Sequence, residues 1–527
     1  MLSKTHIFSS AVLFALLPSS SVLADVVAQD VWKNLNAHAS AFGGTLTANL
    51  EETDTGLTIT QVTYHVGMSL PAMGANNSPT PLFDAKLQLP DLTLVNKSDG
   101  TVSISVPAST ITAAQINFPE MEQELLFEMQ MASNDLISVA AGKAGEVTYT
   151  TSATTIAYSG DFVLPEALFE GAQGDSQVSM QMETHNVASV VTITEGAVLK
   201  MTSNGSIGVT TMHTETRSSA GDGMLSIQKS TTHDQKTRAN LSLPTENLNL
   251  FNLADALDRG LELAARVTSG AASQVETVTL GEEVISQSDV SAASSGVELA
   301  FTNQGFSMAM EAEEAHVSAE IPMLLPTTLS GSLKEAAFSL ALPLRKLDTA
   351  GLFEYSTRFV GAELDDSVWA LFDPSGALPH DPAMFEMDVT GTVTSKVEWL
   401  NLLDVPDAMS ALGGELPFEP ENLTIKTLAL EAAGAKLRAS GAFTFDVTDL
   451  KTYGGIPRPD GQIEVDIQGL NALLDTLISM GLVADSDAMG ARMMLATVTK
   501  AVGEDHLTSK VEMSPEGHVL ANGNRLK

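Results

Sequence analysis

The feature that most constrains the fold is a long succession of short runs in which apolar and polar residues alternate. Residues 85–89 and 102–106 are two of many such runs between residues 45 and 228. Turn-forming sequences, such as those at residues 98–100 and 203–205, separate the runs. A period of two is typical of half-buried strands, and such turn sequences are typical of hairpins. This part of the chain is therefore predicted to be an antiparallel meander.

The same pattern resumes in the second half of the chain and includes a hairpin over residues 423–445. Between the halves lies a Ser-, Ala- and Gly-rich segment, residues 269–296, which we interpret as a candidate linker with room for a strand. The predicted fold is mainly β, with extended antiparallel sheets of many hairpin-connected strands and a few short amphipathic helices. The predicted domains are a β-rich half with a leading helix at 25–268 and a β-rich half with short helices at 297–527.

Helical periodicity is confined to a few segments. Val27, Val31 and Leu35 fall on one face of a predicted helix over residues 25–42, which Gly43 ends. Residues 244–267 carry a broad apolar face and form the clearest internal helix. Shorter helices are expected near residues 365–372, 399–412, 470–480 and 488–502.

Residues 1–24 have the pattern of a secretory signal peptide. Lys4 precedes an apolar segment at 7–17, and small residues precede a cleavage site between Ala24 and Asp25. The apolar segment is far shorter than the ~20 residues that span a bilayer, which disfavours a retained anchor. No later segment reaches that length without charges, so no transmembrane segment is expected in the mature chain. These observations predict a periplasmic protein.

The chain is strongly acidic. Lys and Arg number 27 against 65 Asp and Glu, a net charge of −38, which becomes −39 when Lys4 leaves with the signal. A surface of this sign repels phosphate backbones and excludes nucleic acid as a partner. The chain has no Cys, which excludes thiol nucleophiles and thiolate metal sites.

No catalytic or cofactor motif is present: there is no His-Glu-x-x-His, no Gly-x-Ser-x-Gly, no P-loop and no dinucleotide fingerprint. Asp485 begins a run like a calcium loop, but Ala496 stands where the loop requires glutamate, so a helix N-cap is the better interpretation. We expect no enzyme activity, no metal and no cofactor. The 22 methionines suit either a loosely packed core or a surface for apolar ligands.

Residues 365–393 combine a predicted short helix, a proline-rich corner and a strand. The helix contains Trp369 and Phe372, and Asp373-Pro374-Ser375-Gly376 predicts a turn after it. Alternation from Phe385 onward predicts the strand.

Asp373, His380 and Asp381 in this stretch allow two interpretations. One is a catalytic or metal cluster. The other, which we favour, is a rigid corner with the aspartates in turn hydrogen bonds and His380 at the surface, because Asp-Pro pairs are common turn formers.

A set of aromatic, acidic, proline and glycine residues in the same stretch resembles the motif of the domain of unknown function 2125 family, which contains secreted proteobacterial proteins. Residues 24–32 and 517–526 support the resemblance, which extends over essentially the whole mature chain. The family has no established activity, so the resemblance implies structural and not catalytic roles for the motif residues. They are Trp369, Phe372, Asp373, Pro374, Pro379, Asp381, Pro382 and Gly391.

Residues 423–446 are also similar in style to the AsmA-like envelope proteins, which are β-rich and linked to outer-membrane lipid homeostasis. Three functional hypotheses follow. The first is an envelope protein that binds lipid or another apolar ligand on the apolar face of a curved sheet. The second is a structural or assembly-assisting protein with envelope proteins as partners and no small ligand. The third is a hydrolase with an unfamiliar site around Asp373, His380 and Asp381.

Overall fold

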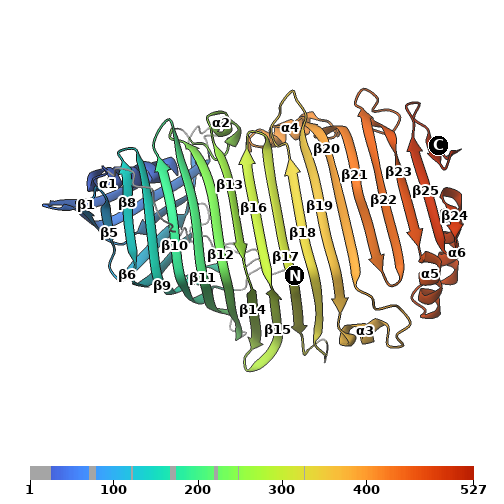
Figure 1. The fold of residues 1–527 in the computed structure, drawn as a ribbon, viewed down its shortest axis with the longest axis horizontal. Coiled ribbons are helices and arrows are strands. Elements are labelled where there is room, and N and C mark those ends of the chain that lie inside the picture. Colours follow the sequence, from blue (N-terminus) through green and yellow to red (C-terminus); the bar gives the residue numbers. More distant parts are fainter. Residues whose placement is uncertain are drawn as a thin grey trace. The chain divides into compact units, whose positions relative to one another are not determined.

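The computed structural model describes residues 25–70, 79–119, 123–166, 174–218, 223–246, 248–323, 325 and 327–527. These residues form 27 β-strands and six helices, which confirms the mainly β, antiparallel prediction (Figure 1). They divide into two compact units: unit 1 is Met1–Leu248 with Arg259–Ile285, and unit 2 is Asn249–Asp258 with Ser286–Lys527. The predicted signal, with Ala24, lies outside the described residues.

Unit 1 contains one helix, α1 (Ala28–Ala41), followed by fourteen complete strands among its described residues. The strands are β1 (Gly44–Thr53), β2 (Gly56–Leu70), β3 (Thr80–Gln88), β4 (Leu92–Asn96), β5 (Val102–Ser105), β6 (Ser109–Phe118), β7 (Gln123–Asn134), β8 (Ile137–Lys143), β9 (Glu146–Leu164), β10 (Ser176–Thr194), β11 (Val198–Ser218), β12 (Met224–Pro244), β13 (Glu262–Ser269) and β14 (Ala272–Leu280).

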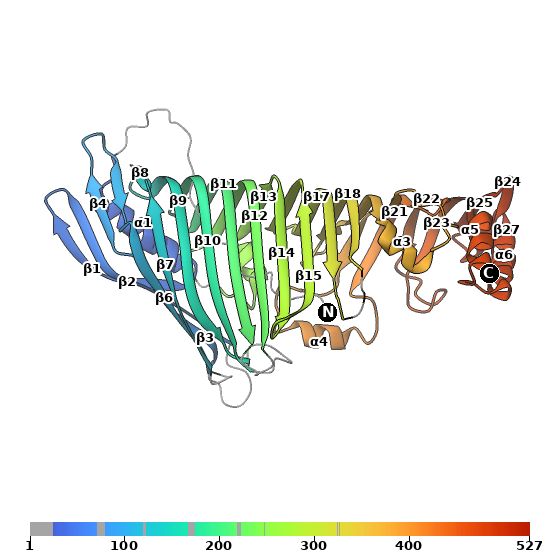
Figure 2. The ribbon, with the colours of Figure 1, turned by 90° about the horizontal axis from the view of Figure 1, so that it is seen from below.

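The order of the first strands differs from the predicted meander because the sheet of unit 1 splits into two ribbons. The first half of β2 pairs with β4 and its second half pairs with β3. At the other side, the first half of β9 pairs with β8 and its second half with β7. The ribbons β4–β5–β8 and β3–β6–β7 therefore connect the same two strands, and they diverge in Figure 2. The predicted turn at residues 203–205 is wrong, since these residues lie inside β11.

Helix α1 confirms the predicted leading helix, and Gly43, with φ of 78°, follows its end. The helix buries Val31 completely, and the aliphatic side chains Ile59, Leu94 and Leu199 of unit 1 are equally inaccessible. A buried hydrogen bond from Tyr149 Oη to Asn34 Oδ1 (2.8 Å) ties α1 to β9. Unit 1 therefore has a closed hydrophobic core beneath α1.

Long strands of both units contain residues with left-handed backbone. In unit 1 these are Asn186 of β10 (φ 53°) and Asp234 of β12 (φ 48°); in unit 2 they are Glu314 (φ 48°) and Gly361 (φ 66°). The register of β10 against β9 and β11 is the same on both sides of Asn186, so no extra residue is inserted there. The buried positions of β10 nevertheless change from even numbers such as Thr184 to odd numbers such as Val187.

Unit 2 contains the remaining helices and strands. They are α2 (Leu253–Asp258), β15 (Glu283–Ala292, which begins in unit 1), β16 (Ser294–Thr302), β17 (Gly305–Glu320), β18 (Leu329–Leu342), β19 (Gly351–Leu364), α3 (Asp366–Phe372), β20 (Ala383–Ser395), α4 (Val405–Ala411), β21 (Phe418–Ala432), β22 (Ala435–Asp446), β23 (Arg458–Gln468), α5 (Leu470–Ser479), α6 (Asp485–Val498), β24 (Lys500–Gly503), β25 (His506–Met513), β26 (Val519–Ala521) and β27 (Asn524–Arg525).

The helix predicted over residues 244–267 is wrong for most of its length. Only Leu253–Asp258 is helical, and Glu262–Ser269 forms β13, which pairs with β12. Gly260 stands between them with φ of 98°, a conformation that ends a helix. Beyond it, Leu263 and Ala265 are the period-two residues of a strand, and pairing with β12 prevails over helix propensity.

The segment at residues 269–296, interpreted as a candidate linker, consists almost entirely of strand. It forms β14, β15 and the beginning of β16. Residues Ala272–Leu280 pair in continuous register with β12, and the boundary between the compact units follows Ile285, inside β15. Small Ser and Ala side chains suit both a linker and closely paired strands, so the composition alone could not distinguish the two.

No helix among the described residues is both long and apolar enough to cross a bilayer.

Candidate functional site

The residues of the predicted corner are brought together between α3 and β20. Helix α3 ends at Phe372, and Gly376 N donates to Asp373 O across the predicted turn (3.1 Å), with Gly376 at φ of 63°. The side chain of Trp369 contacts Phe372, with ring centroids 4.8 Å apart. The sequence therefore located this helix, its turn and the following strand correctly.

Asp373 is the buried centre of the corner. Its carboxylate accepts hydrogen bonds from the backbone N–H groups of Leu378 (2.8 Å) and Ala377 (2.9 Å), and from the hydroxyl of Ser375 (3.2 Å). The hydrogen bonds from Leu378 and Ala377 lower the pKa of Asp373 to about 2. A carboxylate held as an anion in this way stabilises a turn and is a poor general base.

His380 completes the corner. Its Nε2 lies 3.2 Å from Asp373 Oδ2, and its ring stacks on Trp369 with centroids 3.9 Å apart. Asp381, the third residue of the predicted cluster, is exposed and lies outside this group of contacts. The geometry matches a rigid corner. No group of three His, Asp or Glu side chains in the described part of the chain is placed to hold a metal ion.

Two further motif residues have steric roles. Pro379 lies against Gly434, at the β21–β22 turn, where a Cβ atom on Gly434 would stand 3.2 Å from the proline ring. A Cβ atom on Gly391 would stand 2.3 Å from the carbonyl oxygen of Asn422, so only glycine allows β20 and β21 to approach as they do. Pro374 and Pro382 are exposed at the corner.

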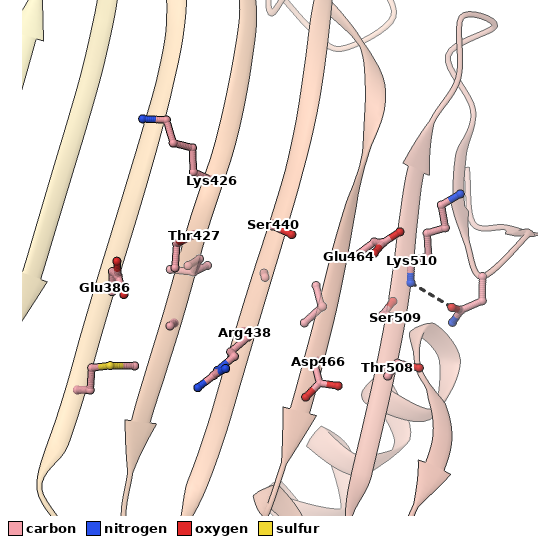
Figure 3. A pocket seen from close by; sticks show the side chains of 16 residues that line it. Glu386, Lys426, Thr427, Arg438, Ser440, Glu464, Asp466, Thr508, Ser509 and Lys510 are labelled. Atoms are coloured by element: carbon pink, nitrogen blue, oxygen red, sulfur yellow. Dashed lines mark hydrogen bonds between the residues drawn. The ribbon is translucent and has the colours of Figure 1, made fainter. Parts of the chain in front are cut away.

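A hollow of about 710 Å³ lies on the polar face of the sheet of unit 2. Figure 3 shows its charged side chains, which project from neighbouring strands toward the same side. Its cations already have anionic partners: Lys426 lies 3.3 Å from Asp388, and Arg438 lies 2.8 Å from Glu431. The hollow is a polar surface lined by three cations and three carboxylates, so its formal charges balance.

The opposite face of the same sheet is apolar across nine strands. Directly paired residues of antiparallel strands project from the same face. One row of paired positions consists of Val297, Met310, Phe338, Thr357, Met387, Leu428, Ala439, Val465 and Ser509.

Two neighbouring rows have the same character. One consists of Leu299, Met308, Leu340, Tyr355, Val389, Ile425, Gly441, Ile463 and Val511. The other consists of Ser295, Ala312, Ala336, Phe359, Phe385, Leu430, Leu437, Ile467 and Leu507. We call these three rows the apolar face. It contains no charged side chain.

Much of the apolar face is accessible. Val297 and Leu430 are 46% exposed, and Met310 and Phe359 are 44% exposed. Most other large side chains of the three rows are half-buried, whereas Val389 and Ile467 are buried. A second layer of structure would bury such residues almost fully, as in unit 1. The apolar face is therefore one side of a single-layered sheet.

One place where the apolar side of the sheet is closed lies near the end of β20. The backbone of α2 and its preceding turn docks there, with Leu253 N donating to Leu400 O and Leu402 N donating to Phe251 O (both 2.8 Å). The guanidinium of Arg345 bridges Asp258 and Glu398 at 3.1 Å from each, which fixes this contact. The alternation of β16–β23 predicted a two-sided sheet, but the absence of a covering layer depends on distant parts of the chain and was not visible in the sequence.

Comparisons with known proteins identify one family. Residues 261–515 match the family model described as "Uncharacterized protein conserved in bacteria (DUF2125)". The match includes the corner and Gly391, whereas residues 24–32 and 517–526, which carried the rest of the resemblance, lie outside it. No curated protein and no solved structure matches the chain. The similarity to AsmA-like proteins therefore stays a prediction.

Proposed function

We propose that the chain, which matches the bacterial family DUF2125 over residues 261–515, binds lipid by holding acyl chains against the apolar face of unit 2. The observation that carries this proposal is the exposure of Val297, Met310, Phe359 and Leu430 on a face without charges. Apolar surface left in water is unfavourable, and each CH₂ group buried against it contributes about 0.8 kcal/mol.

The dimensions of the apolar face suit a hydrocarbon chain. Each row crosses nine paired strands, so at a strand spacing of ~4.8 Å it is roughly 38 Å long. An acyl chain lying along a row would contact one side chain per strand, while its polar headgroup stays in water. Met308, Met310 and Met387 are flexible enough to follow a chain that changes shape.

We place this function in the cell envelope, after export and cleavage between Ala24 and Asp25. The arrangement of Lys4, the apolar segment at 7–17 and small residues before Asp25 supports export, and so does the style of residues 423–446. The test is the N-terminal sequence of protein recovered from the periplasmic fraction. A mature chain beginning at Asp25 is expected, and an intact Met1 in the cytoplasmic fraction would contradict the placement.

The lipid proposal is tested by two matched substitutions in β17. Met310→Glu puts a charge on the apolar face. Ala309→Glu, at the adjacent position of β17, puts the same charge on the opposite face of the sheet. Native mass spectrometry of protein purified from its own cell envelope would measure bound lipid. We expect lipid on the parent chain and on Ala309→Glu, and a strong loss on Met310→Glu with an unchanged circular dichroism spectrum.

Two results would overturn the proposal. One is a parent protein free of lipid that also takes up no fatty acid or phospholipid in solution. The other is an equal effect of the two substitutions. If the parent instead co-purifies with an envelope protein that Met310→Glu releases, the apolar face binds a protein partner, and the structural hypothesis replaces the lipid one. The hydrolase hypothesis gains no support from Asp373, whose carboxylate is held within the turn.

A further inference from the structure

The helical pair α5–α6 at the end of unit 2 presents apolar side chains outward. Met489 and Met493, one turn apart on α6, are each 63% exposed, and Met494 is 70% exposed. Leu482 before the helix and Val502 in β24 are also exposed. Helix α5 has no fully buried residue, and its leucines are half-buried. Such helices usually turn their apolar side inward.

The exposure of α6 is a fixed feature of the fold, because the helix is anchored on its other side. Ala488 is buried, and Arg492 Nη2 donates to Asp475 Oδ1 (2.7 Å) and to Asn471 O (3.0 Å), which ties α6 to α5. At the C-terminal end of α6, Val498 O accepts hydrogen bonds from Ser509 Oγ (2.6 Å) and from Asn522 Nδ2 (2.9 Å), which lies between β26 and β27.

The bond to Ser509 also relates α6 to the apolar face. Ser509 ends one of the three rows, so α6 meets the sheet on its apolar side. The exposed methionines therefore stand beside the end of the surface to which lipid binding is assigned. A lipid leaving or entering the rows at this end would pass the helical pair.

The charges around the helical pair select the kind of surface that it can approach. Asp475, Asp485 and Asp487 belong to the two helices, and Lys500 follows them. With a chain charge of −38, a second copy of this protein or an anionic membrane would meet mainly repulsion. A surface of neutral headgroups avoids that repulsion and accepts flexible methionine side chains at its acyl boundary.

From these observations we infer that α5 and α6 dock on a bilayer of zwitterionic phospholipid, at the end of the sheet where acyl chains reach the apolar face. The purpose of this contact rests on the proposed lipid binding, but the contact itself can fail or succeed independently. The side chains that insert are Met489, Met493 and Met494, while Arg492 and Ala488 hold the helix in place.

The test is co-flotation of the full chain with phosphatidylcholine liposomes. The triple substitution Met489→Gln, Met493→Gln, Met494→Gln keeps side-chain length and helix propensity but adds polar groups. Met323→Gln, at a methionine 69% exposed elsewhere in unit 2, is the control. We expect the triple variant to lose binding on the order of tenfold or more, since three partly inserted side chains are lost, and the control to float like the parent.

Adding phosphatidylglycerol to the liposomes should weaken flotation, and high salt should restore it by screening. Met310→Glu should still float, which separates this contact from lipid binding by the sheet. The inference is overturned if the parent does not float with phosphatidylcholine, if it floats only with anionic lipid, or if the triple variant binds normally. A concentration-dependent dimer that the triple variant abolishes would assign the surface to a second copy instead.

Discussion

Units 1 and 2 are built from strands with the same alternation, yet they treat their apolar sides differently. In unit 1, α1 and the two ribbons enclose side chains such as Leu94 and Leu199 completely. In unit 2, residues in equivalent alternating positions, such as Leu430 and Phe359, remain almost half exposed. Alternation therefore determines which side of a strand is apolar, but the elements that pack above it determine whether that side becomes a core or a surface.

The largest expected effect is a difference in stability loss when the same Leu→Ala substitution is made in each unit. Leu199→Ala should lower the free energy of unfolding by about 2–5 kcal/mol, because it leaves a cavity in a closed core. Leu430→Ala should cost under about 1 kcal/mol, because this side chain is already half solvated. Urea denaturation, followed by circular dichroism, measures both. Equal losses would show that the apolar face of unit 2 is covered in solution by lipid or by another protein.

A smaller effect is expected where unit 2 depends on strand pairing more than on a core. Gly391→Ala would bring a Cβ atom to 2.3 Å from Asn422 O, so β20 and β21 must separate locally. We expect a loss of about 1–3 kcal/mol, typical of overpacking, and faster amide exchange in both strands. Gly145→Ala in unit 1, in open space at φ of 80°, is a control for left-handed strain alone. Unchanged exchange in β20 and β21 would contradict the close approach.

The smallest effect is the pH dependence of the stability that Asp373 contributes to the corner of unit 2. The folded pKa of Asp373, about 2, is depressed below its ordinary value of 3.8. Its contribution to stability is therefore fully present above about pH 4 and is lost as the pH falls toward 2. Asp373→Asn should lower the melting temperature at neutral pH, and the difference from the parent should shrink over that window. A difference that stays constant down to pH 2 would exclude the charge as its cause.

Local features of this fold were predictable where the signal lies within a few residues. Asp373-Pro374-Ser375-Gly376 specified the turn after α3, and the hairpin at residues 423–445 became β21 and β22. These elements need only a short stretch of chain to form. The same holds for α1 and for α5.

Features that depend on distant pairing were not predictable. The division of β2 between two partners cannot be read from its own residues, because it is determined by β3 and β4. Asn186 and Asp234 have the residue types of hairpin turns, yet they lie inside long strands with left-handed backbone. The corner residues were located correctly, but the apolar face required the register of nine strands.

The hairpin-by-hairpin construction of the unit 2 sheet has a consequence for how such a molecule changes size. Every strand from β16 to β23 contributes one residue to each row, so the number of strands determines the length of the rows. Inserting one hairpin between β18 and β21 would lengthen each row by about 10 Å, two strand spacings, while leaving the neighbouring pairs able to re-form. A closed core offers no such freedom, because each added side chain must find space in an enclosed volume. A protein with this architecture can therefore lengthen or shorten its apolar face by gaining or losing whole hairpins.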